Sequence, residues 1–189
     1  MIKAVGMIET ISVIRGIEAT DAMLKAAEVA LVFARPVCTG KWLVMVEGDV
    51  AAVRTSVEAG ADIAGEYLQD QMVIPNLHPL VIPALSAVGQ VEKGPALGAV
   101  ETFTVSSGVR AADAAAKMAD IDLLEVRMAI ALGGKCFLLF TGEVSAVSSA
   151  VEAAARQASE EGLLVTTIVI PNPRSELIEA LSGPALIFI

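Results

Sequence analysis

A chain of 189 residues can form one medium domain or two small ones. Its net charge of −9, with no cluster of Lys and Arg, argues against nucleic-acid binding, because neutralising phosphates requires grouped basic side chains. The chain is 55% hydrophobic with a mean hydropathy of +0.69, but the longest charge-free window, residues 71–91, contains three prolines and predicts no membrane span. We therefore expect a cytoplasmic protein with large subunit interfaces and two cysteines outside any disulfide.

The sequence repeats itself across its two halves, which indicates a duplication. Ala4–Thr10 returns as Ala96–Thr102 at an offset of 92 residues, and Gly40 returns as Gly134 at an offset of 94. Further matches are Gly16, Asp21 and Lys25 with Gly108, Asp113 and Lys117, and residues 74–76 with residues 170–172. A stretch rich in glycine and charge around residues 90–95 separates the copies. We predict two domains, residues 1–93 and 94–189.

In chain order, each half predicts the elements β-α-β-β-α-β. The first strand is expected near residues 3–12 and is followed by a helix rich in alanine. Two apolar, β-branched runs, residues 29–37 and 41–47, are joined by a short glycine-bearing turn and predict a hairpin. Asp49 is expected to cap a second helix that has valines at helical spacing. The last strand ends at Pro75, because proline stops further pairing.

The second half repeats this order after residue 94. Glu143 stands where the first half has Asp49, and the last strand ends at Pro171. The pattern predicts an α/β (α+β) fold of two tandem ferredoxin-like domains.

Five segments of the first half resemble the bacterial microcompartment (BMC) domain: residues 6–10, 19–27, 37–41, 48–53 and 74–76. With the duplication, the chain resembles tandem-domain BMC shell proteins of the PduT type, from about residue 3 to residue 181. The resemblance implies a homotrimer whose six domains imitate a hexamer, and a pseudohexamer that tiles with other BMC shell proteins around metabolic enzymes. The resemblance also implies encapsulated redox enzymes as partners. It implies no enzymatic activity for the chain itself.

The resemblance places the loop between the second and third strands of each half around a central pore. The pore-lining residues are then Cys38, Thr39 and Gly40 in the first half and Leu132, Gly133 and Gly134, with the preceding Ala131, in the second. Because Cys38 aligns with Leu132, only the first loop offers a thiol. The resemblance implies that three copies of Cys38 ligate one [4Fe-4S] cluster per trimer, for electron or cluster transfer across the shell. The family motif has proline where this chain has Thr39.

Other residues leave alternative functions open. The resemblance places Lys25 and Lys117 at the shell edge, in contact with neighbouring tiles. Cys136 lies within a predicted strand and is expected to be a buried, inert thiol. One alternative is a shell trimer with a metal-free pore for small metabolites. Another is a ferredoxin-like sensor or enzyme with a small ligand between the halves, although no phosphate-binding glycine loop, zinc spacing or catalytic triad is found.

Overall fold

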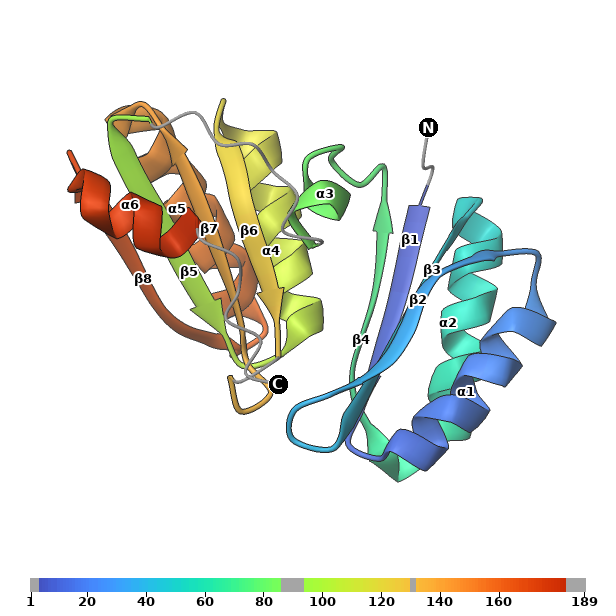
Figure 1. Cartoon of the computed structure of the whole chain (residues 1–189). Coiled ribbons are helices and arrows are strands. Elements are labelled where there is room, and N and C mark those ends of the chain that lie inside the picture. Colours follow the sequence, from blue (N-terminus) through green and yellow to red (C-terminus); the bar gives the residue numbers. More distant parts are fainter. Residues whose placement is uncertain (1–3, 86–93, 130–131, 183–189) are drawn as a thin grey trace.

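The computed structural model describes residues 4–85, 94–129 and 132–182, which form two four-stranded sheets with two long helices each (Figure 1). The first half contains β1 (Ala4–Thr10), α1 (Val13–Ala26), β2 (Ala30–Val37), β3 (Lys41–Gly48), α2 (Val50–Ala64), the 3-10 turn η1 (Gly65–Tyr67), β4 (Leu68–Pro75) and α3 (Val81–Leu85). The second half contains β5 (Ala96–Thr102), α4 (Val105–Met118), β6 (Asp122–Met128), β7 (Cys136–Gly142), α5 (Val144–Glu160), β8 (Leu164–Pro171) and α6 (Ser175–Ser182). No helix within the described ranges is long and apolar enough to cross a membrane.

The two sheets share one topology. Their strand orders are β2-β3-β1-β4 and β6-β7-β5-β8, and every neighbouring pair is antiparallel. The register repeats as well, since Glu9 lies opposite Leu43 and Glu101 lies opposite Phe137. The predicted ferredoxin-like α/β fold and its order of elements are confirmed. The junction proposed at residue 93 lies in a segment outside the described residues.

The starts of the helices differ in detail from the sequence prediction. The first strand ends at Thr10 because Ser12 is the N-cap of α1, where its hydroxyl accepts the N–H of Arg15. Asp49 does occupy the N-cap position of α2, and Glu143 that of α5, but neither side chain makes a capping hydrogen bond. The predicted N-cap position of Asp49 is therefore confirmed, and both carboxylates lie at the positive end of a helix dipole.

One face of each sheet packs against its own two helices. In the first half, the buried side chains of this layer are Ile8, Val44 and Val46 on the strands and Met23, Val53 and Val57 on α1 and α2. A Cβ added to Gly16 would meet Trp42 at 2.4 Å, and one added to Gly108 would meet Cys136 at 2.4 Å. The recurring glycine therefore lets α1 and α4 approach the third strand of their sheets closely.

The other face of the first sheet packs against the second half. Figure 1 shows α4 between the two sheets, with α3 beside it. The core formed there joins strand residues of the first half to α4 of the second, and its members include Val5, Met7, Leu43, Met45 and Met72 with Val105, Val109 and Ala112. Because this layer is apolar and buried, hydrophobic burial holds the two halves together as one body.

Candidate functional site

The turn between β2 and β3 carries three of the predicted pore residues. Cys38, Thr39 and Gly40 lie between Val37 and Lys41, where the hairpin reverses direction. Gly40 has a φ of +80°, a left-handed conformation that glycine adopts without steric cost. Cys38 is half-buried, while Thr39 and Gly40 are exposed. The tip of the hairpin therefore presents a thiol and a hydroxyl close to solvent.

The turn between β6 and β7 is its counterpart. The N–H of Lys135 donates to the carbonyl of Leu132 at 3.2 Å. Gly133 and Gly134 have φ values of +62° and +86°. Leu132 is half-buried, Gly133 is exposed and Gly134 is buried, whereas Ala131 lies outside the described residues. This turn offers an apolar side chain where the first turn has its cysteine.

A buried lysine joins the two turns, which lie at the same end of the molecule (Figure 1). The Nζ of Lys41 pairs with Oε1 of Glu9 at 2.9 Å and donates to the carbonyl of Gly134 at 3.3 Å. The Oε2 of Glu9 accepts the N–H of Val105, the first residue of α4, at 2.9 Å. We call Glu9, Lys41, Val105 and Gly134 the interdomain clamp. The side chains of Glu9 and Lys41 bond to each other, and each also bonds to the backbone of the second half.

The electrostatics of the interdomain clamp follow from burial. Removal from water raises the pKa of Glu9, and this is opposed by the hydrogen bond and charge of Lys41 and by the N–H of Val105. The carboxylate also faces the positive end of α4. Sequence analysis assigned no role to this pair. The signal was present, because Glu9 and Lys41 recur as Glu101 and Lys135.

The recurring pair has a different environment. Glu101 and Lys135 also form an ion pair, but their side chains are 28% and 38% exposed, against 0% and 10% for Glu9 and Lys41. Among the described residues, no helix start or loop of another domain bonds to the second pair. The first Glu–Lys ion pair is thus buried between the halves, whereas the equivalent pair of the second half is partly exposed to solvent.

A second polar group also holds the halves together. The Nη2 of Arg110, on α4, lies 3.2 Å from Oδ2 of Asp70 and 2.6 Å from Oε2 of Glu161. The hydroxyl of Thr104 donates to Asp70 at 2.5 Å. The start of α4 is therefore fixed to the edge strand of the first sheet by charge as well as by apolar contact.

Cys136 is fully buried on β7, beneath α4. Burial raises the pKa of its thiol, and the negative charges of Glu9 and Glu125 raise it further. The thiolate is the reactive form of cysteine, so this residue is chemically inert in the folded chain, as the sequence predicts.

The two lysines predicted for the shell edge lie in the last turns of α1 and α4. Lys25 pairs with Asp21 at 2.5 Å, and Lys117 pairs with Asp113 at 2.6 Å. Each lies twelve residues beyond the first residue of its helix, about 18 Å along the axis from the helix end near the β2–β3 and β6–β7 turns. Asp113 also accepts the N–H of His78 at 2.8 Å, which ties the segment before α3 to α4.

The BMC domain family model matches residues 4–77 and again residues 96–173. The chain belongs to the BMC-domain family. It is 44% identical over 177 residues to the bacterial microcompartment shell protein PduT of Citrobacter freundii, covering 94% of this chain and 96% of that protein. It is 31% identical to a carboxysome assembly protein, CcmO, of Synechocystis sp., covering 92% of this chain and 63% of that protein.

A solved structure supports the same assignment. The crystal structure of a microcompartment protein from Desulfitobacterium hafniense is similar to this chain with a TM-score of 0.84 and 46% identity, over 95% of this chain and 99% of that one. The predicted resemblance to tandem-domain BMC shell proteins of the PduT type is thus confirmed. In BMC terms, each matched segment contains one complete four-stranded sheet and its two helices.

Among the residues that the structure describes, the thiol of Cys38 belongs to no metal site formed by one chain. Within the ranges that the structure describes, no three His, Cys, Asp or Glu side chains gather closely enough to hold a metal ion. A cluster ligated through Cys38 would therefore take its thiolates from several copies of the chain. The position fits such sharing, because Cys38 is half-buried at the tip of a hairpin.

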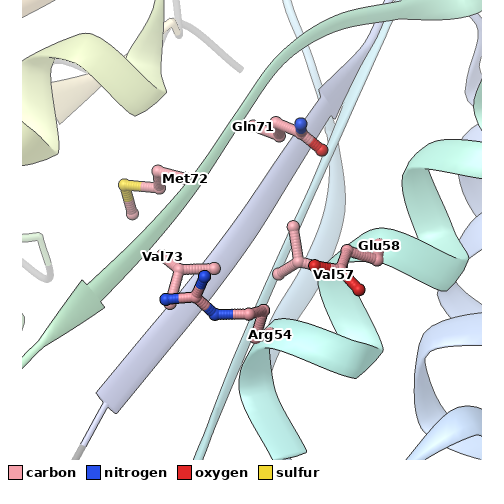
Figure 2. Close-up of a pocket in the computed structure, with 6 residues that line it drawn as sticks. All are labelled: Arg54, Val57, Glu58, Gln71, Met72 and Val73. Carbon is pink, nitrogen blue, oxygen red and sulfur yellow. The ribbon is translucent and has the colours of Figure 1, made fainter. Parts of the chain in front are cut away.

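Two of the hollows on the BMC domains lie apart from the predicted pore and edge residues. One, of about 270 Å³, lies between α2 and β4, and Figure 2 shows the residues that line it: Arg54, Val57, Glu58, Gln71, Met72 and Val73. Arg54 and Glu58 lie on the helix side of it, and Met72 points away from the helix. The other, of about 310 Å³, lies between the halves, where the Arg35 guanidinium is 5.0 Å from the Phe33 ring and beside Met128. Neither contains a predicted pore or edge residue.

Proposed function

We propose that the chain is a structural tile of a bacterial microcompartment shell. Three copies form a pseudohexameric ring of six BMC domains, residues 1–93 and 94–189 of each copy, with a central pore. A [4Fe-4S] cluster held by three copies of Cys38 carries electrons, or is itself transferred, across the shell. The carrying observation is a mismatch in burial between α1 and α4, two helices that occupy equivalent places in the two halves.

The outer face of α1 is exposed where the same face of α4 is buried. Ile14 is 75% exposed, whereas its counterpart Ser106 is fully buried. Ile17 is 47% exposed, and its counterpart Val109 is fully buried against the first sheet. Exposed isoleucines on a helix whose twin is covered indicate that a partner covers α1.

The second sheet offers the matching surface. Met72 of the first sheet is 4% exposed beneath α4, whereas its counterpart Ile168 on β8 is 47% exposed. An apolar hollow of about 320 Å³ opens there, lined by residues that include Ala99, Glu101, Phe137, Leu139 and Ile168. The α1 of a second copy fits this face as α4 fits the first sheet.

Such a contact is head-to-tail and closes into a ring. Each domain would contact the next as the first half contacts the second, and six equivalent steps between domains complete a closed ring of three chains. The β2–β3 and β6–β7 turns, which we call the pore turns, lie at one end of the domain interface, so one turn from each domain would line the axis. Cys38 would then appear three times, alternating with Leu132.

The residues at the axis fit an iron–sulfur cluster. Three thiolates can ligate three irons, and the exposed turn of Thr39 and Gly40 carries backbone N–H groups able to hydrogen-bond sulfide. When bound, the cluster supplies one-electron redox chemistry. Lys25 and Lys117, at the helix ends away from the pore, are suited to contact neighbouring shell tiles at the edge.

The experiment combines oligomer mass with metal content. We expect a species three times the 19.5 kDa chain mass by native mass spectrometry. After anaerobic reconstitution, we expect about four irons and four acid-labile sulfides per trimer, with no cluster in Cys38→Ser. The matched control is Cys136→Ser, which removes the other thiol of the chain and should keep the iron.

The outcomes separate the two levels of the proposal. Trimers without iron in both the unmodified protein and Cys38→Ser would contradict the redox role and leave a metal-free pore for small metabolites. A monomer that never forms trimers or sheets would contradict the shell tile itself and favour the small-ligand alternative.

A further inference from the structure

The interdomain clamp has a twin that faces outward. In the clamp, Glu9 binds the start of α4 through the N–H of Val105, and Lys41 binds the carbonyl of Gly134. Both charged side chains are almost completely buried. The halves are thus fixed at the end where the two pore turns lie.

The twin pair occupies the equivalent place on the second sheet. Glu101 lies one residue before the end of β5, as Glu9 does in β1, and Lys135 immediately precedes β7, where Lys41 begins β3. The two side chains pair with each other, yet both remain partly open to solvent. They border the apolar hollow to which Glu101 itself contributes.

The groups that the twin pair would bind are also present, on the first half. A Cβ added to Gly134 would meet Nζ of Lys41 at 2.7 Å, whereas the space around its counterpart Gly40 holds nothing within 4 Å among the described residues. Val13, the counterpart of Val105, is the first residue of α1. Its N–H belongs to the helical turn that has no acceptor within the helix.

We propose that Glu101 and Lys135 form an intersubunit clamp that holds the Cys38 turn of a second copy of this chain. The Glu101 carboxylate accepts the N–H of Val13 of the partner subunit, and the Lys135 ammonium donates to the carbonyl of Gly40 of the partner subunit. This inference rests on the proposed trimer and adds the residues that lock it.

The clamp assigns a positioning role to Lys135. Its bond reaches the residue two positions after Cys38, in a turn that is otherwise exposed. One subunit therefore fixes the position of the neighbouring subunit's thiol. Assembly buries Glu101 and Lys135 together. Removing either side chain would leave the charge of the other uncompensated in the interface.

The test is a double-mutant cycle on dissociation of the full chain. The variants are Lys135→Met, Glu101→Gln and the double change, with Arg156→Met on the exposed side of α5 as a control that removes the same charge. Sedimentation over a range of concentrations gives the concentration at which half of the trimer dissociates. We expect each single change to raise it at least ~100-fold, and the double change to raise it less than the two effects combined.

A second readout follows the Cys38 turn directly. At concentrations where Lys135→Met remains trimeric, we expect the rate of Cys38 alkylation in the apo-protein to increase severalfold, with Arg156→Met unchanged. Circular dichroism of each variant confirms that the chain is folded.

The results distinguish this inference from the proposed function. If the unmodified protein is not a trimer, the proposed function fails and the clamp fails with it. If it is a trimer and the single variants dissociate and are alkylated like Arg156→Met, the clamp is wrong while the trimer stands. The same holds if the effects of the two single changes on dissociation simply add.

Discussion

Replacing Ile14 by aspartate should separate the proposed trimer into folded single chains. Ile14 is 75% exposed on α1, and complete burial of an isoleucine contributes ~1.5–3 kcal/mol, so its burial at each interface contributes about 1–2 kcal/mol. Aspartate removes this contribution and places a carboxylate in an apolar contact, where desolvation costs several kcal/mol. We expect a loss of about 4 kcal/mol at each interface.

The closed ring multiplies this loss. A loss of about 4 kcal/mol is a factor of about 10³ at one interface and about 10⁹ over three interfaces. Because the dissociation constant of a trimer scales with the square of concentration, the concentration for half dissociation rises by about 10⁴. The isolated chain should keep its melting temperature, since Ile14 is exposed and an acidic residue in the first helical turn is favourable.

The assay is sedimentation velocity over a wide concentration range, with Ile63→Asp as the matched control. Ile63 is 40% exposed on α2, and its counterpart in the second half is the polar Gln157, so the control adds the same charge away from the proposed contact. Equal dissociation of Ile14→Asp and Ile63→Asp would refute the assignment of α1 to the interface. Unfolding of Ile14→Asp would refute the claim that this face is free within one chain.

Three further outcomes are expected. A thiol reagent should label only Cys38 in the folded apo-protein and both cysteines after denaturation, because burial raises the pKa of Cys136; rapid labelling of two thiols in the folded state would contradict this. Gly134→Ala should lower the melting temperature by at least ~2–4 °C, since the residue has a φ of +86° and its Cβ would meet Lys41, and calorimetry that finds no change would exclude this strain. The pKa of Glu9 is raised above its ordinary value of 4.5, so its contribution to stability is fully present below that pH and is lost as pH rises through the folded pKa. The melting temperature of the unmodified protein relative to Glu9→Gln should therefore fall between acidic and neutral pH, and an increase would show the opposite shift.

The fold was predictable because its signals are local and appear twice. Alternating apolar runs, the recurring Gly16 and the prolines that end the last strands each specify one element. Two copies of the same pattern remove the ambiguity that a single copy would leave. The N-cap position of Asp49 was also predictable, but whether its side chain bonds the helix depends on a rotamer that the sequence does not specify.

The site was predictable only in part. Sequence analysis identified the two turns, and the structure brings them to one end of the molecule. The sequence analysis did not identify the contact of Lys41 with Gly134 or of Glu9 with Val105. Both contacts cross between the halves, so they depend on how the second half packs against the first. The repeat alone marks the pair Glu9–Lys41 as equivalent to the pair Glu101–Lys135. Only the difference in burial shows that the first pair already bonds to the other half of the chain.

Fusion of the two domains changes how the proposed ring assembles. Three of its six domain contacts form within single chains, at an effective concentration set by the linker, and do not weaken on dilution. The two kinds of contact are also free to differ in chemistry. In the contact within one chain, Arg110 and Asp70 form an ion pair. In the contact between chains, their counterparts are Glu18 and Thr166. A ring built this way has permanent and reversible contacts in alternation, so dilution acts on only three of the six.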